Sequence, residues 1–229
     1  TIVAKQLISF NTEVDTLIKS KKLKKDDAIF NVLREYVKTT KSILFDGDGY
    51  SSAWEKEAKR RGLSNLRKTP EALSVRMNKD VIDLFDSMHV MNPVEQKARY
   101  EIQLEQYVQR IEIESLVLEN LVNNQILPTA FKYQSVLIEN VKGLKEIYGE
   151  DFSKHAPVAL STIEKISSLT DKLASTCEAL AKERTKANRM SKSDDQAQMY
   201  AKNVLPIFDK IRECVDGLEL IVDDSAWPL

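Results

Sequence analysis

Apolar residues recur at steps of three and four along most of this chain, which is the spacing of one face of an α-helix. The first such stripe consists of Val3, Leu7, Phe10, Val14, Leu17 and Ile18. The run KSKKLKKDD after it predicts the end of this helix, because lysines suit the negative end of the helix dipole. A second helix is expected up to about Ile43, and its buried face is predicted to hold Ile29, Leu33, Tyr36 and Val37.

Short elements are predicted between residues 46 and 91. The run FDGDGYSS contains two glycines in three residues and predicts a loop, and the helix after it is expected to stop at Gly62. Helix N-caps are predicted at Ser51 or Ser52, at Thr69 and at Asn78 or Asp80. The inward positions of the last of these helices are Val81, Leu84, Phe85 and Met88.

A much longer helix is predicted to begin at Asn92 or Pro93 and to end at Gly149. Asn92-Pro93-Val94-Glu95 combines a cap, a proline in the first turn and the acid of a capping box. Pro128 cannot donate a backbone hydrogen bond, but the apolar periodicity resumes directly after it. We therefore expect a kink or a restart at Pro128 and no loop.

The last third of the chain is predicted to form a helical hairpin. One stripe consists of Leu160, Ile163, Ile166, Leu173, Cys177 and Leu180, and the other of Val204, Phe208, Ile211, Val215, Leu218 and Val222. Ser193 and Gln196 form a predicted capping box after the polar run NRMSKSDDQ. If the turn is centred in residues 191–194, residues whose numbers sum to about 385 face each other. Cys177 and Cys214 have numbers that sum to 391, so they are expected within about two helical turns (~11 Å) of each other along the arm, and both are expected as thiols.

These patterns predict an all-α fold of long antiparallel helices, with a terminal helical hairpin and short connecting helices. The expected parts are residues 1–45, which continue from an upstream domain, a connector over 46–91, a long helix over 92–149, and the hairpin with the C-terminal tail over 150–229.

Composition narrows the classes of protein that fit. The 229 residues include only six Gly and six Pro, which argues against β-sandwiches, propellers and glycine-rich nucleotide folds. The 34 basic and 35 acidic side chains nearly cancel, so no nucleic-acid partner is expected. Apolar runs are too short for a membrane helix. Two cysteines make no disulfide framework, which favours a reducing, cytoplasmic location.

Residues with catalytic chemistry are scarce. His89 and His155 lie in no metal-binding spacing and are interpreted as surface or interface histidines. Cys177 and Cys214 are interpreted as small core residues, because neither has a CxxC motif or cationic neighbours in sequence. Phosphate-loop, nucleophile-elbow and dinucleotide motifs do not occur. No catalytic, cofactor-binding or metal-ligating residue is therefore assigned.

Two charged segments admit a functional interpretation. In the run Asp46–Ser51 the acids resemble an EF-hand with Glu57 at the twelfth position, but Tyr50 replaces a ligand and Ser51 the required glycine. An ordinary turn before a helix cap is preferred. The basic patch consists of Lys56, Lys59, Arg60, Arg61, Arg67 and Lys68. It could bind an anionic ligand, yet the interspersed glutamates favour a solvated or salt-bridging face.

Two runs resemble the C-terminal region of type III glutamine synthetases. They are FDGDGYSSAWEKEAKRRGLSNLRKTPEAL and ARYEIQLEQYVQRIEIESLVLENLVNNQILPTAFKY. The opening TIVAKQL resembles the helix after the last catalytic segment of that family, and DSAWPL resembles its terminal motif. Between residues 151 and 223 only the helical pattern is similar.

The resemblance implies a parent enzyme that joins ammonia to glutamate through a γ-glutamyl phosphate, with ATP and magnesium or manganese. It also implies a homo-oligomer of two stacked hexameric rings. The motifs that bind metal, ATP and glutamate in that family are expected before residue 1, so this segment is expected to be inactive alone. Its implied role is to pack on the upstream catalytic domain and on neighbouring subunits.

The alternative is a free-standing helical interaction or adaptor module with no enzymatic activity. Such a module is expected to begin with its own helix cap and a start methionine, whereas this sequence opens with Thr1 inside an amphipathic helical pattern. The length of the native polypeptide separates the two hypotheses.

Overall fold

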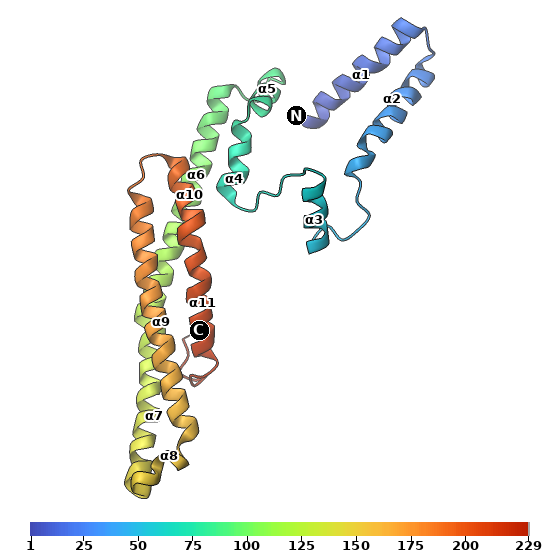
Figure 1. Ribbon diagram of the computed structural model, residues 1–229. Coiled ribbons are helices and arrows are strands. Elements are labelled where there is room, and N and C mark those ends of the chain that lie inside the picture. The colour runs from blue at the N-terminus through green and yellow to red at the C-terminus, as the bar shows by residue number, and fades with distance from the viewer. Residues whose placement is uncertain (229) are drawn as a thin grey trace. The chain divides into compact units, whose positions relative to one another are not determined.

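The computed structural model describes residues 1–228, and all of its regular elements in that range are helices (Figure 1). The predicted all-α class is thus confirmed. The chain divides into two compact units, one up to Tyr100 and one from Glu101 onward, which we describe separately.

The first unit begins with the antiparallel hairpin of α1 (Ile2–Lys21) and α2 (Lys25–Thr40). Its core is Val14, Ala28 and Val32, with the ring of Phe10 edge-on to Tyr36 at 6.2 Å. Lys22 adopts a left-handed conformation (φ 53°) and ends α1. The lysine-rich run therefore terminates the helix as its sequence predicts.

The predicted buried face of α2 was partly wrong. Ile29 and Tyr36 pack against the core, but Leu33 and Val37 are 48% and 69% exposed. The positions that face α1 are instead Ala28 and Val32, because the small Ala28 side chain lets the two helices approach. Apolar residues thus occupy two sides of α2, and only one side packs within the described chain.

Short helices complete the first unit: η1 (Lys41–Ile43), α3 (Ser52–Arg60), α4 (Thr69–Ser74), η2 (Val75–Met77) and α5 (Lys79–Ser87). Ser51 caps α3 by accepting a hydrogen bond from the backbone N–H of Trp54 at 3.3 Å. Asn78 occupies the N-cap position of α5. The predicted cap at Thr69 is wrong by one residue, since α4 already includes Thr69 and Lys68 precedes it.

A long helical rod starts with α6 (Pro93–Leu121) and continues through η3 (Val122–Ile126) into α7 (Leu127–Tyr148). The predicted capping box is present: Asn92 Oδ1 accepts from the Glu95 N–H at 2.9 Å, and Glu95 Oε2 accepts from the Asn92 N–H at 2.8 Å. The predicted restart near Pro128 takes the form of one π-helical turn, which absorbs the missing proline N–H without a loop.

In the second unit, α9 (Pro157–Asn188) packs along both α7 and α11 (Leu205–Glu219) (Figure 1). η4 (Gly149–Asp151) and α8 (Phe152–His155) connect α7 to α9, while α10 (Ser193–Met199) and the π turn η5 (Tyr200–Val204) lead into α11. The fully buried residues include Ile166, Leu173, Leu180, Val204, Ile211, Cys214 and Leu218. Phe208 and Val215 are only half-buried, because the preceding residues, Ile207 and Cys214, are the ones buried in the contact between α11 and α9.

The register of the hairpin agrees with the predicted pairing. Lys172 and Glu213 approach to 4.0 Å, the amide of Asn203 donates to Glu183, and Gly217 lies against Leu169. The numbers in these pairs sum to 385 or 386. The predicted capping box at Ser193 is wrong, however: Ser193 already lies within α10, which follows Lys192.

Candidate functional site

In the acidic loop after α2, residues 46–51, polar groups form hydrogen bonds with one another. Asp48 Oδ1 accepts from the Tyr50 N–H at 2.9 Å, and the Ser51 hydroxyl donates to the Asp48 carbonyl at 2.7 Å. Glu57, the twelfth position of the EF-hand alignment, binds Arg60 and Arg61. Over residues 1–228, no group of three or more His, Cys, Asp or Glu side chains is placed to hold a metal ion.

The three arginines of the basic patch form salt bridges with neighbouring glutamates. Arg60 Nε and Arg61 Nε donate to opposite oxygens of Glu57 at 2.7 and 2.6 Å, and Arg67 binds Glu55. The hydrogen bonds from Arg60 and then Arg61 lower the pKa of the Glu57 carboxyl to about 2. For these three arginines the salt-bridging interpretation of the patch is the one that the geometry supports.

Arg61 also joins two segments of the first unit. Its Nη1 donates to the carbonyls of Ser42 and Leu44 at 2.9 and 2.6 Å. The guanidinium lies 5.9 Å from the ring centre of Phe45 and 5.8 Å from that of Trp54, and these two rings are 4.3 Å apart. Sequence reasoning missed this clamp, although the closely spaced Phe45 and Trp54 were a signal for it.

Both histidines are exposed, as the sequence predicts. His155 stacks on Tyr148 with ring centres 3.9 Å apart, and His89 follows α5 with a positive φ of 51°. Neither belongs to a group of side chains placed to hold a metal ion among residues 1–228.

The two cysteines are buried free thiols in the hairpin core. Burial, followed by the negative charge of Glu119, raises the pKa of Cys177 to about 11, and burial also raises the pKa of Cys214. The thiolate is the nucleophilic form, so a high pKa makes these thiols inert. The interpretation of both as core residues is confirmed.

We expect Cys177 to react slowly with an alkylating reagent at pH 8. A pKa of about 11 instead of the usual 9 lowers the thiolate fraction about a hundredfold, before burial is counted. Labelling followed by mass spectrometry measures this, with the urea-unfolded protein as the fast control. Equal rates in the folded and unfolded protein would contradict the buried placement.

A polar network crosses the second unit and was not predicted. Arg184 on α9 donates to Glu119 at 2.7 Å and to the buried hydroxyl of Ser115 at 3.3 Å, both on α6. Nearby, the Asn188 amide donates to Glu112 at 2.6 Å and accepts from the Tyr200 hydroxyl at 2.7 Å. These bonds fix the register of α9 against α6 and η5.

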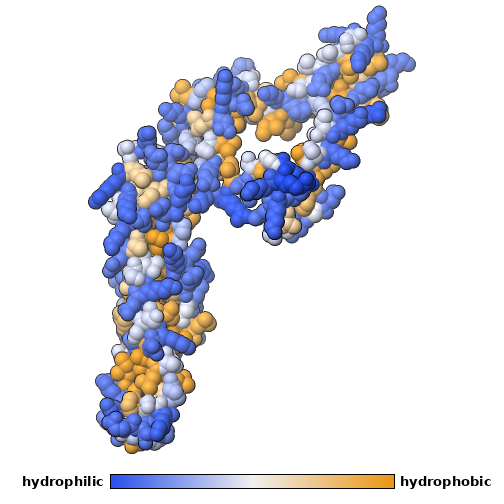
Figure 2. Space-filling view, viewed as in Figure 1, coloured by the Kyte–Doolittle hydropathy of each residue, from blue (hydrophilic) through white to orange (hydrophobic). Residues whose placement is uncertain are grey.

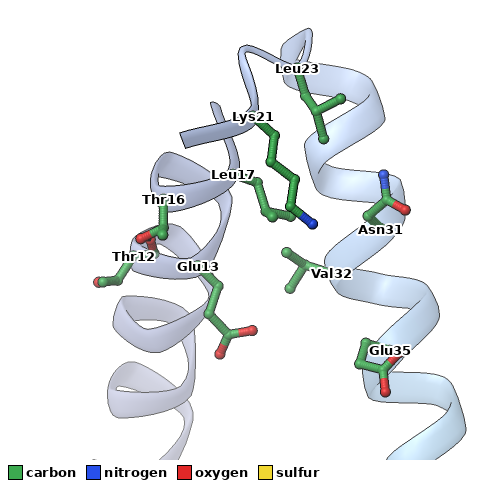
Figure 3. A pocket seen from close by; sticks show the side chains of 9 residues that line it. All are labelled: Thr12, Glu13, Thr16, Leu17, Lys21, Leu23, Asn31, Val32 and Glu35. Carbon is green, nitrogen blue, oxygen red and sulfur yellow. The ribbon is translucent and has the colours of Figure 1, made fainter. Parts of the chain in front are cut away.

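A groove of about 600 Å³ lies between α1 and α2 (Figure 3). Its apolar floor is formed by Leu17, Leu23 and Val32. Its polar rim consists of Thr12, Glu13, Thr16, Lys21, Asn31 and Glu35. The side chains of Leu17 and Lys21 point into the space between the helices (Figure 3). Such a surface suits contact with another polypeptide segment better than catalysis, because it lacks a nucleophile paired with a base.

Large apolar side chains remain exposed on both units. On α1 and α2 they are Ile2, Val3, Leu7, Ile8, Phe30, Leu33 and Val37, and on α6 they include Ile102, Ile113, Leu116 and Val117. Figure 2 shows apolar side chains among the polar surface of α1 and α2. Exposed apolar side chains gathered on one helix face are a common feature of surfaces that bind another polypeptide.

Residues 1–228 thus form a helical segment with exposed apolar faces. Among the helices of residues 1–228, none is long and apolar enough to cross a bilayer. The glutamine synthetase C-terminal domain family matches residues 28–145, just over half of the chain. The chain belongs to this family, which confirms the resemblance seen in residues 45–73 and 98–133.

Three relatives are similar over most or all of the chain. A glutamine synthetase of Bacteroides fragilis is 35% identical over 228 residues, covering 99% of the chain and 31% of the relative. A type-3 glutamine synthetase of Dictyostelium discoideum is 31% identical, covering 100% of the chain and 31% of the relative. A glutamine synthetase of Butyrivibrio fibrisolvens is 28% identical over 199 residues, covering 87% and 28%. The chain thus spans less than a third of each relative's length.

Proposed function

We propose that residues 1–229 are the C-terminal helical segment of a type-3 glutamine synthetase, with a role in structure and assembly. The observation that carries this proposal is the similarity to glutamine synthetases over 99% of the chain but only 31% of the relative. The apolar faces of α1, α2 and α6 support a packing role, because they need cover from other polypeptide segments.

The proposed reaction of the whole enzyme is the ATP-dependent ligation of ammonia to glutamate through a γ-glutamyl phosphate. ATP and magnesium or manganese are its proposed cofactors. The donor set over residues 1–228 does not fit such a metal, since its acidic loop is folded on itself and Glu57 is bound to two arginines. The catalytic residues are therefore proposed to lie outside this chain, and no reaction step is assigned to it.

The proposed partners are the catalytic domain of the same polypeptide and neighbouring subunits, in two stacked hexameric rings in the cytoplasm. The groove between α1 and α2 supports the first contact, because its floor of Leu17, Leu23 and Val32 is apolar. The exposed Leu33 and Val37 offer further apolar surface on α2. The outer face of α6 supports a second contact.

Mass spectrometry and an activity assay of the native polypeptide test this proposal. We expect a chain several hundred residues longer than this one, with ATP-dependent glutamine formation in the whole protein and none in residues 1–229 alone. A native mass near 26.1 kDa would contradict the proposal and favour the adaptor module.

A further inference from the structure

Three Asp-Gly pairs occur in this chain, at residues 46–47, 48–49 and 216–217. In such a pair the backbone nitrogen of glycine can attack Cγ of the preceding aspartate, because glycine has no Cβ to obstruct the approach. The new N–Cγ bond closes a succinimide ring, and a carboxyl oxygen leaves as water together with the amide proton. Water then attacks the main-chain carbonyl carbon of the aspartate and breaks its bond to nitrogen, which leaves isoaspartate. The water released in the first step balances the water added in the second, so no oxidant or cofactor is needed.

Asp46-Gly47 is the pair that is free to react. Both residues are exposed, and they lie between η1 and α3, outside any helix. Among residues 1–228, no hydrogen bond or ion pair involves the Asp46 carboxylate or the Gly47 N–H. The attacking nitrogen and the carbon that it attacks are therefore not held apart by other bonds.

Hydrogen bonds restrain the other two pairs. Asp48 Oδ1 accepts from the Tyr50 N–H at 2.9 Å, and the Asp48 carbonyl accepts from the Ser51 hydroxyl at 2.7 Å. Gly217 lies within α11, so its N–H belongs to the hydrogen-bond ladder of that helix. The carboxylate of Asp216 lies 3.6 Å from Nε of Arg212. Reaction at Asp216 therefore requires α11 to open first.

We propose that Asp46 is a site of spontaneous isoaspartate formation, and that this modification loosens the clamp of Arg61 on Phe45 and Trp54. Isoaspartate carries the main chain through Cβ and Cγ, so the path from Phe45 to Gly47 becomes one carbon longer. The inference goes beyond the proposed function and does not depend on it, because it concerns only residues 44–61.

The clamp is sensitive to this extra carbon because the backbone is held on both sides of it. Arg61 Nη1 donates to the Leu44 carbonyl at 2.6 Å, and the bonds of Asp48 hold the other end. Between these points a Cβ added to Gly47 would lie only 2.5 Å from Cζ of Phe45. A longer main chain there displaces the Phe45 ring from that of Trp54, whose centre is 4.3 Å away.

Incubation of the full-length polypeptide at neutral pH and physiological temperature tests the modification. Isoaspartate is detected by methyl transfer from S-adenosylmethionine with an isoaspartyl methyltransferase, and electron-transfer dissociation of the peptides assigns its position. We expect at least about tenfold more isoaspartate at Asp46 than at Asp216, and less at Asp48 than at Asp46. No isoaspartate at Asp46, or no more there than at either other position, overturns the inference.

Two variants of Asp46 test the chemistry. Asp46→Glu keeps the charge but would have to close a six-membered ring, so the methyl transfer assigned to this position should disappear. Asp46→Asn undergoes the same attack with ammonia as the leaving group, so its peptide should gain the mass that accompanies loss of the amide. An Asp46→Asn protein that keeps its amide through the same incubation would contradict the placement of the Gly47 nitrogen.

Hydrogen exchange on the incubated full-length protein tests the effect on the clamp. Backbone amides of α3 should exchange faster as isoaspartate accumulates, because Trp54 loses the cover of Phe45, while those of α9 should not change. Treatment with the methyltransferase returns isoaspartate to aspartate and should restore the exchange of α3. Unchanged exchange of α3 at high isoaspartate content would overturn the proposed loosening of the clamp.

Discussion

Replacing Ile211 by Ala should destabilise the second unit by about 3–4 kcal/mol. Ile211 is completely buried on α11 where that helix packs along α9, and removal of a buried isoleucine leaves a cavity that a closely packed seam cannot fill. The measurement is the free energy of unfolding in urea, followed by helical circular dichroism.

Val215 provides the matched control for this prediction. It lies on the same helix four residues later but is only half-buried, so Val215→Ala should cost about 1 kcal/mol. Equal losses for the two variants would mean that the seam of α11 does not face α9 at Ile211.

Replacing Arg184 by Ala should cost roughly 3 kcal/mol. The Arg184 side chain is only 13% exposed, and its removal leaves the Glu119 carboxylate without its cationic partner. The Ser115 hydroxyl keeps its bond to the Glu112 carbonyl, so the unpaired carboxylate accounts for most of the loss. The free energy of unfolding in urea measures the loss at neutral pH.

A double variant separates the ion pair from the packing. Arg184→Met with Glu119→Leu should recover most of the stability, because no unpaired charge remains. Lys142→Ala breaks the exposed pair with Glu139 and should change the free energy by less than about 0.5 kcal/mol. If Arg184→Ala were as mild as Lys142→Ala, the network would not fix the register of α9.

Local signals predicted where several helices begin and end. Asn92 and Glu95 form both bonds of a capping box, and the two residues lie only three positions apart in the sequence. Gly149 ends α7 with a positive φ, which glycine adopts readily. Ser193 and Gln196 carry the same kind of signal but do not cap α10. Gln196 instead donates to Asn188, which lies across the turn.

Apolar periodicity could not identify which face of α2 packs inside this chain. Phe30, Leu33 and Val37 are exposed there, while Ala28 and Val32 form the core. When a helix is apolar on two sides, the sequence gives two candidate faces, and only the packing partner decides between them. The exposed face is consistent with the proposed contact to the rest of the enzyme.

The polar network and the second π turn were beyond sequence reasoning for another reason. Arg184 meets Glu119 across 65 residues and Asn188 meets Glu112 across 76, so their pairing depends on tertiary register. A π turn precedes Pro206 just as one precedes Pro128. The regular apolar spacing of the hairpin gave no sign of the second turn. Such turns shift the helical phase by only one residue.

The claim that this segment supports assembly while the chemistry lies elsewhere is tested most directly by the whole polypeptide carrying Ile211→Ala. Native mass and ATP-dependent glutamine formation are measured on the same sample. We predict a smaller fraction of intact assembly, with unchanged glutamine formation per intact assembly. Intact assembly with selectively abolished glutamine formation would place the active site in this segment and contradict the account.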